Sequence, residues 1–358
     1  MKTEEAFSFF AGKILSGVEG VFWSERDKKG KESWIMGIGK NVPADFEKGP
    51  FPFFSLMSFL GDEKYALHFK EWYSVENTPI VGTRLIASLP GGIHLPKNLA
   101  QCSSETEQTF CQKVEQVKKY SADGEVWVLN LAHALSGKLP DERALLSVFS
   151  KFLELGKPHA SGVWWMNEQK MCSMSPEVFL RQNGKIISTF PIKGTGTKSY
   201  LEKSEKEKAE LSMVTDLLRN DLGQIAKKVW VKRERVLEDY GRFYQAHAEI
   251  FAELAEPILK WKDFKKLLPC GSISGAPKKR VIEKIRELES FNRKFYTGTM
   301  GVKMSSDTFI ANILIRTLFV EGNRWVFPVG AGLTCDSVPR AEWKETLQKA
   351  EILRQCTG

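Results

Sequence analysis

Apolar residues recur at helical spacing in a long and highly charged segment of the chain. Within residues 201–228 they stand three or four positions apart, as on one buried helix face: Leu211, Val214, Leu217, Leu218, Leu222 and Ile225. We predict a helix over this segment and another over residues 339–355.

Both predicted helices carry closely spaced glutamates. Glu207 and Glu210 lie one turn apart on the first helix, and Glu342, Glu345 and Lys349 share one face of the second. Carboxylate oxygens from two helices suit a hard divalent cation, whereas an isolated pair is typical of a solvated surface. The pattern leaves both interpretations open.

Two further helices are predicted. Residues 103–124 open with a Ser/Glu pairing typical of a helix N-terminus, and residues 141–156 end at a glycine, Gly156. Residues 125–135 lie between them and have the composition of a strand. Residues 1–100 alternate short aromatic runs with Gly and Pro, which indicates irregular β structure.

An Asn-Gly pair inside residues 178–190 is a strong signal for a tight hairpin. A two-residue turn at this pair would place Gln182 opposite Lys185. Glu177 and Lys193 then leave the hairpin at the same end. A carboxylate beside an ammonium is either a strand-end salt bridge or a pair that does chemistry.

Residues 295–333 are predicted as three antiparallel strands, the second over 308–320. The turn positions place Tyr296 opposite Arg316, and Arg316 opposite Val329 and Gly330. This row offers a phenol, a guanidinium and exposed backbone amides, which are donors suited to carboxylates. A core arginine bonded to nearby carbonyl groups is the alternative.

Composition is that of an ordinary globular protein, with 358 residues, 42% hydrophobic and 27% charged. One large α/β domain or two domains are compatible with this length. The net charge of +8 indicates affinity for an anion, whether nucleic acid, a metabolite or an acidic partner. The basic residues are scattered and form no nucleic-acid module, so no nucleic-acid partner is expected.

Six cysteines are present, and none has the spacing of a zinc site or disulfide framework. Reduced thiols fit the cytosol. The N-terminus has no secretory signal pattern, and no run of eighteen apolar residues could span a membrane. We therefore expect a cytoplasmic protein without membrane contact.

Seven ordered motifs resemble those of the chorismate-utilising enzymes, which include anthranilate, aminodeoxychorismate, isochorismate and salicylate synthases. They are SPEVFL (175–180), PIKGT (191–195), AELSMVTDLLRNDLG (209–223), GSISGAPKKR (271–280), YTGTMGV (296–302), ILIRT (313–317) and GAGLTCDSVPRAEWKETLQKA (330–350). The resemblance covers residues 110–355. We expect one catalytic domain over 1–358, in which residues 1–105 match the family poorly.

The resemblance implies an α/β (α+β) fold in which two antiparallel sheets pack face to face, with helices outside and the active site between them. It also implies Mg²⁺ as the cofactor, bridging the enzyme and a carboxylate of chorismate. The family's metal carboxylates match Glu210 and Glu345. Glu207 and Glu342 match positions next to these ligands or bound through water.

Substrate-binding positions of the family also find matches in this chain. They are Gly194, Thr195, Ser274, Gly275, Tyr296, Arg316, Gly330, Gly332 and Lys349. His247 matches an active-site histidine of the family, although its sequence context alone indicates a core histidine. These roles are implied by the resemblance.

The residue before the glycine of PIKGT separates two branches of the family. Anthranilate synthases typically have Ala there, whereas aminodeoxychorismate synthases have Lys, as at Lys193. In that branch the lysine is proposed to add to ring C2 as the C4 hydroxyl leaves, and ammonia then attacks C4. Glu177 matches a carboxylate proposed to act as an acid or base.

The resemblance thus implies component I of an aminodeoxychorismate synthase, on the route to p-aminobenzoate and folate, with ammonia delivered by a separate glutamine amidotransferase subunit. Anthranilate synthase component I is the alternative. Val128 stands where isochorismate and salicylate synthases have a Lys base and amine-transferring members more often have Gln. Gly196-Thr197-Lys198 replaces the family's Arg-x-Arg, and no clear Leu-Leu-Glu-Ser feedback motif is present.

Overall fold

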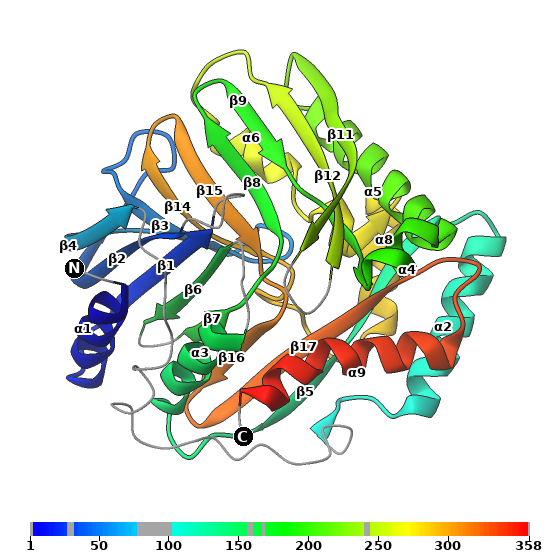
Figure 1. Cartoon of the computed structure of the whole chain (residues 1–358), viewed down its shortest axis with the longest axis horizontal. Helices are drawn as coiled ribbons and strands as arrows, with labels where there is room; N and C mark the ends of the chain where they lie inside the picture. The colour runs from blue at the N-terminus through cyan, green and yellow to red at the C-terminus, as the bar shows by residue number, and fades with distance from the viewer. Residues whose placement is uncertain are drawn as a thin grey trace.

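The computed structural model of the chain describes residues 3–26, 32–76, 102–155, 160–166, 169–239 and 244–356. Within these ranges, helices surround a network of 17 strands (Figure 1). All of the strand pairings in the described residues are antiparallel.

The strands follow one another through space in an order unlike their order in sequence. The first layer runs β13 (Gly275–Ala276), β5 (Val128–Lys138), β17 (Arg324–Leu333), β16 (Thr317–Glu321), β7 (Lys170–Ser173), β6 (Ala160–Trp165), β1 (Gly20–Arg26) and β2 (Glu32–Pro43). The second runs β3 (Phe53–Met57), β14 (Thr299–Ser305), β15 (Thr308–Ile313), β8 (Val178–Asn183), β9 (Ile186–Thr189) and β12 (Tyr244–Glu253), with β10 (Ile192–Gly196) and β11 (Lys228–Asp239) beside β12.

Strand β4 (Lys64–Glu76) joins the two layers, because it pairs with β3 at its beginning and with β2 along the rest. The layers face each other across a buried cluster to which both contribute, including Trp23 and Trp164 from the first and Phe54 and Met300 from the second. The predicted fold of two facing antiparallel layers is therefore confirmed. The layers are also hydrogen-bonded into one network.

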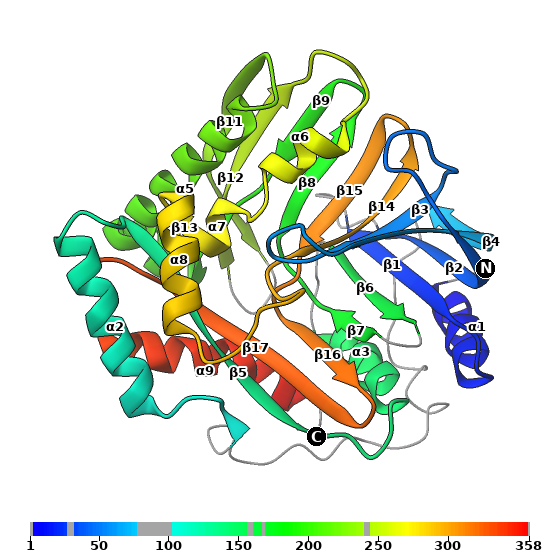
Figure 2. The same cartoon turned by 180° about the vertical axis from the view of Figure 1, so that it is seen from behind.

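Helices pack on the outer sides of the strands. They are α1 (Thr3–Leu15), α2 (Glu107–Ala122), α3 (Ala144–Leu155), α4 (Lys198–Lys203), α5 (Glu205–Gly223), α6 (Trp261–Lys266), α7 (Gly271–Ser274), α8 (Lys278–Leu288) and α9 (Pro339–Gln355). Figure 1 shows α9 running alongside β17 and β5, and Figure 2 shows α6 and α8 in front of the strands from behind. No helix in the described residues is long and apolar enough to cross a bilayer.

Most predicted helices form, and their ends differ where side chains cap them. The helix predicted over 339–355 has those bounds. The one predicted over 201–228 is two helices, because the hydroxyl of Ser204 accepts the N–H of Glu207 and starts α5 anew. The helix at 103–124 begins only at Glu107, with Thr106 and not a serine as its N-cap.

The hairpin of β8 and β9 is offset by two residues from its predicted register, which was wrong. Its turn consists of Gly184 and Lys185, so Gln182 lies opposite Ile187. Gly184 adopts a left-handed φ of 59°, and its N–H donates to the carbonyl of Asp307 in the neighbouring hairpin. An even offset leaves each side chain on its predicted face.

The pairings of β14 with β15 and of β16 with β17 have the predicted registers. Thr299 pairs with Ile313, which is the register that places Tyr296 opposite Arg316. Phe319 pairs with Val326, which is the register that places Arg316 opposite Val329. The single strand predicted over 308–320 is wrong. The chain leaves β15, which belongs to the second layer, and enters β16, which belongs to the first. The residues between these strands therefore cross from one layer to the other.

Helix α1 and strands β1 to β4 occupy a region predicted only as irregular β structure. The alternation of aromatic residues in this region indicated the strands but not the helix. Gly156, the predicted end of α3, lies outside the described residues.

Candidate active site

A cavity of about 490 Å³ lies between β5 and β17 of the first layer and β10 and β12 of the second layer. Strands β5 and β17 line it with Asn130, Gly330 and Gly332, while β10 and β12 line it with Lys193 and Gln245. Helices α5 and α9 contribute acidic side chains. The cavity therefore collects side chains that are far apart in the sequence.

Most residues predicted as site residues line this cavity. They are Glu177, Lys193, Gly194, Thr195, Glu207, Glu210, Tyr296, Arg316, Gly330, Gly332, Glu345 and Lys349. Four others, His247, Ser274, Gly275 and Glu342, do not belong to the lining.

A β-bulge aims Lys193 into the cavity. Between the paired positions Ile192 and Thr195, strand β10 has two residues where β12 has one. Lys193 Nζ lies 3.5 Å from the carbonyl oxygen of Ser272. Gly194 follows with a left-handed φ of 86°, and a Cβ there would lie only 2.9 Å from an oxygen of Glu207. Glycine is therefore required both by the left-handed backbone conformation and by the lack of room for a side chain.

Glu177 is buried on the cavity wall and accepts a hydrogen bond of 2.9 Å from the hydroxyl of Ser272. Burial raises the pKa of this carboxyl to about 7, although the Ser272 bond and the positive charges of Lys193 and Arg316 favour its charged form. A carboxyl with this pKa can give or accept a proton near neutral pH. The interpretation of Glu177 and Lys193 as a simple strand-end salt bridge is not supported, since no direct ion pair joins them within the described residues.

Ser272 is a site residue that the sequence interpretation missed. It belongs to the motif GSISGAPKKR, in which the family resemblance implies a substrate-binding role for Ser274 and not for Ser272. Ser274 does not line the cavity, and its hydroxyl donates to the carbonyl of Cys270 at 2.8 Å. Gly275 packs against β5, where a Cβ would lie 2.0 Å from the carbonyl oxygen of Val128.

Tyr296 and Arg316 both line the cavity. Neither lies in a strand. Arg316 stands where the chain crosses between layers, with a left-handed φ of 49° and with its carbonyl accepting the N–H of Met174. Such a φ is uncommon for a residue with a side chain and persists only when its surroundings hold it.

The glutamates of α5 and α9 approach each other at one end of the cavity. Lys206 bridges the two helices, with Nζ 3.7 Å from Glu210 and 3.9 Å from Glu342. Burial and the neighbouring Glu210 raise the pKa of Glu207, and burial raises the pKa of Glu342. Glu342 is only 2% exposed, so the interpretation of these glutamates as a solvated surface is wrong for it.

Lys349 connects α9 to β17. Its Nζ lies 2.7 Å from Glu345 and 2.8 Å from the carbonyl oxygen of Gly330. Burial disfavours the charge on Glu345, but the Lys349 ammonium outweighs this and lowers the pKa of the carboxyl. The ammonium groups of Lys206 and Lys349 thus lie among the carboxylates of the two helices.

These carboxylates are hard oxygen donors of the kind that Mg²⁺ prefers. In the part of the chain that the structure describes, however, no three acidic, His or Cys side chains are grouped tightly enough to hold a metal. The donor chemistry suits a divalent cation, but the carboxylates are not drawn together around one in this arrangement. Lys206, whose side chain is 60% exposed, lies between Glu210 and Glu342 instead.

His247 lies on β12, opposite Ile192 of β10 and therefore next to Lys193 in the sheet. Its ring nitrogens lie 3.6 Å from Glu238 and 3.9 Å from Glu249. The imidazole is buried among these side chains and does not line the cavity. The imidazole thus lies against side chains of β11 and β12, outside the cavity lining.

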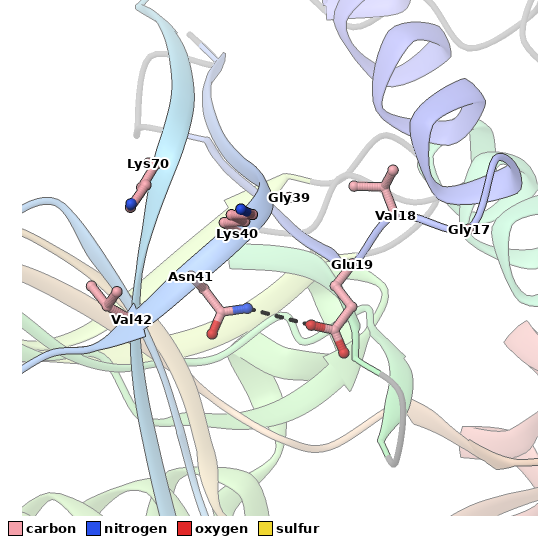
Figure 3. A pocket seen from close by; sticks show the side chains of 8 residues that line it. All are labelled: Gly17, Val18, Glu19, Gly39, Lys40, Asn41, Val42 and Lys70. Atoms are coloured by element: carbon pink, nitrogen blue, oxygen red, sulfur yellow. Dashed lines mark hydrogen bonds between the residues drawn. The ribbon is translucent and has the colours of Figure 1, made fainter.

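A second hollow, of about 660 Å³, lies near the N-terminal strands (Figure 3). Its lining includes Glu19, Lys40 and Lys70, and the amide of Asn41 donates to Glu19 at 3.4 Å. None of the predicted site residues lies there. Its lining has no pair of carboxylates and no residue from the seven motifs.

Comparison with known proteins agrees with the motifs. The family described as chorismate binding enzyme matches residues 87–355, which extends the resemblance upstream of residue 110. Aminodeoxychorismate synthase component 1 of Bacillus subtilis is 33% identical over 264 residues, which is 70% of this chain and 56% of that protein. Anthranilate synthase component 1 3 of Haloarcula marismortui is 32% identical over 274 residues, 72% of this chain and 54% of that protein.

The chain spans about half the length of these relatives. Among solved structures, MenF, the menaquinone-specific isochorismate synthase from Escherichia coli, matches with a TM-score of 0.83 and 18% identity, covering 99% of this chain and 91% of that one. This likeness shows a shared fold.

We predict that Ser272→Ala raises the pKa of Glu177 above about 7. In the wild-type protein the hydrogen bond from Ser272 stabilises the charged carboxylate, and the variant loses this stabilisation. A ¹³C NMR titration of labelled glutamate measures this shift, with Glu177→Gln assigning the signal. Ser274→Ala is the matched control, since the Ser274 hydroxyl donates to a backbone carbonyl, that of Cys270. An unchanged or lower pKa in Ser272→Ala would contradict the prediction.

Proposed function

The chain belongs to the chorismate binding enzymes, and from this we propose that it is component I of an aminodeoxychorismate synthase. It would convert chorismate and ammonia to 4-amino-4-deoxychorismate. The observation that carries the proposal is Lys193, the lysine of PIKGT, which lines the cavity beside the buried Glu177. An alanine, typical of anthranilate synthases at this position, offers no amine.

Lys193 is proposed as the nucleophile. Its Nζ bonds to ring C2 while the C4 hydroxyl leaves, and ammonia then bonds to C4 while the lysine leaves C2. Splitting one displacement into two steps lowers the barrier of each. The Ser272 carbonyl, 3.5 Å from Nζ, orients the amine.

Glu177 is proposed to protonate the leaving hydroxyl. Its pKa of about 7 keeps a large fraction of this carboxyl protonated at neutral pH, and the Ser272 hydroxyl holds one of its oxygens. Once deprotonated, the same carboxylate accepts a proton from ammonia. Tyr296, Arg316 and the backbone at Gly330 are proposed to bind the carboxylates of chorismate, as donors on the cavity wall.

Mg²⁺ is proposed as the cofactor, held by Glu210 and Glu345 with Glu207 and Glu342 nearby. When bound, the cation neutralises a carboxylate of the substrate and fixes its position. Lys206, which bridges Glu210 and Glu342, would then turn toward solvent. Lys349 would remain with Glu345 and Gly330 as a link between α9 and β17.

A glutamine amidotransferase subunit is proposed as the source of ammonia. Support comes from the relatives, which are named as component 1 of their synthases. Anthranilate synthase component I is the second candidate, because a relative of that name is 32% identical to this chain. Both candidates use chorismate and ammonia and differ in the ring carbon that is aminated.

Product analysis tests the proposed function. Incubation with chorismate, Mg²⁺ and ammonium salt should form 4-amino-4-deoxychorismate, which an added lyase converts to p-aminobenzoate. Chromatography with mass detection separates p-aminobenzoate from anthranilate. Anthranilate as the product would replace the first candidate by the second.

We predict that Lys193→Ala slows amination by roughly a thousandfold or more, because the covalent step is lost. Intact-mass analysis of the wild-type protein with chorismate should detect an adduct that this variant lacks. Lys198→Ala, at an exposed lysine a few residues away, is the control and should keep both the rate and the adduct. A Lys193→Ala rate equal to that of wild type would exclude this lysine as the nucleophile.

Glu210→Gln and Glu345→Gln should each weaken Mg²⁺ binding by about tenfold or more, because each removes one anionic oxygen donor. Competition between Mg²⁺ and the paramagnetic ion Mn²⁺ measures binding without a turnover assay. Glu351→Gln, on the exposed part of α9, is the control. Wild-type affinity in both cavity variants would exclude these glutamates as ligands.

A further inference from the structure

Arg293 lies outside the cavity lining but is one of the most fully bonded side chains near it. Its side chain is 3% exposed and forms a two-bond pair with Glu289, from Nε at 2.8 Å and from Nη2 at 2.6 Å. The Glu289 side chain is 2% exposed. A buried pair of this kind leaves the remaining guanidinium donors for other partners.

Those donors reach three separate walls of the cavity. Nη2 donates to the carbonyl of Asn130 on β5 at 2.7 Å, and Nη1 donates to the carbonyl of Ile273, next to Ser272, at 3.1 Å. Nη1 also donates to the hydroxyl of Thr297, next to Tyr296, at 3.2 Å. One planar group thus sets the spacing between segments that lie far apart in sequence.

Glu289 adds a further contact to β5, because its carboxylate accepts the backbone N–H of Ala132 at 2.9 Å. The ion pair is therefore bonded to β5 at two places. Burial raises the pKa of Glu289, while the Arg293 charge and its hydrogen bonds act to keep the carboxylate ionised. Replacing only one partner would leave the other buried without its counter-charge.

The turn that follows Arg293 has an unusual backbone. Lys294 and Thr297 have left-handed φ values of 45° and 62°, and Tyr296 lies between them. The Tyr296 N–H donates to the carbonyl of Arg293 at 2.7 Å. Its ring centre lies 5.6 Å from the guanidinium carbon. Such a conformation is retained only where the surroundings enforce it, and the Thr297 contact supplies part of that restraint.

We propose that Arg293 is a positioning residue for chorismate binding, which holds Tyr296, the segment with Ser272, and β5 at the spacing that the substrate requires. This inference rests on the proposed substrate, chorismate, and not on which ring carbon is aminated. Lysine cannot replace arginine here, because one ammonium group cannot form the paired bonds to Glu289 and also reach all three walls.

The test is the dissociation constant of chorismate, measured by isothermal titration calorimetry on the full chain, together with denaturant unfolding of each variant. Arg293→Lys should raise the dissociation constant about tenfold or more, because small displacements of binding groups have large effects. Arg233→Lys is the matched control. Arg233 forms a similar two-bond pair with the buried Glu249, outside the cavity lining.

Thr297→Val is the second variant, in case Arg293→Lys fails to fold. It removes the hydroxyl that accepts from Arg293 and donates to the carbonyl of Tyr296, and it leaves the ion pair intact. It should raise the dissociation constant about threefold. Wild-type affinity in a folded Arg293→Lys or in Thr297→Val would overturn the proposal. Amination at C2 instead of C4 would overturn the proposed function, while these binding measurements would still decide the role of Arg293.

Discussion

The arrangement of opposite charges around one cavity is the constraint on which the site depends. Acidic side chains of α5 and α9 meet there, and desolvation would drive them apart or protonate them if no cation were near. Lys206 and Lys349 provide that positive charge from within the chain. The carboxylates are also hard oxygen donors, the kind that a divalent cation prefers.

Backbone irregularities aim the reactive side chains into this charged space. A bulge in β10 turns Lys193 inward, and left-handed conformations at Gly194 and Arg316 let the chain change direction beside the cavity. A regular strand would alternate its side chains between two faces and could not present adjacent residues to one ligand. The departures from ideal geometry thus lie where the chemistry is proposed.

The quoted motifs divide their residues between the cavity and its support. In GSISGAPKKR, Ser272 contacts Glu177, whereas Lys278 forms an ion pair of 2.9 Å with the buried Asp221 of the motif on α5. That pair fastens the Ser272 segment to α5. Arg293 and Glu289 fasten the same segment to β5 from the other side. A motif that marks a site in sequence therefore does not imply that each of its residues touches the ligand.

Periodicity and motif order determined much of this protein from sequence alone: the helix at 339–355, the facing antiparallel layers, and the segments that supply Lys193, Glu210 and Glu345. These follow from local spacing and from motif resemblance, which do not depend on distant contacts. Only the tertiary structure decided that Ser272 and not Ser274 faces Glu177, and that Arg293 ties three walls together. Bulges, turn offsets and left-handed residues are set by neighbours remote in sequence, so local patterns do not encode them.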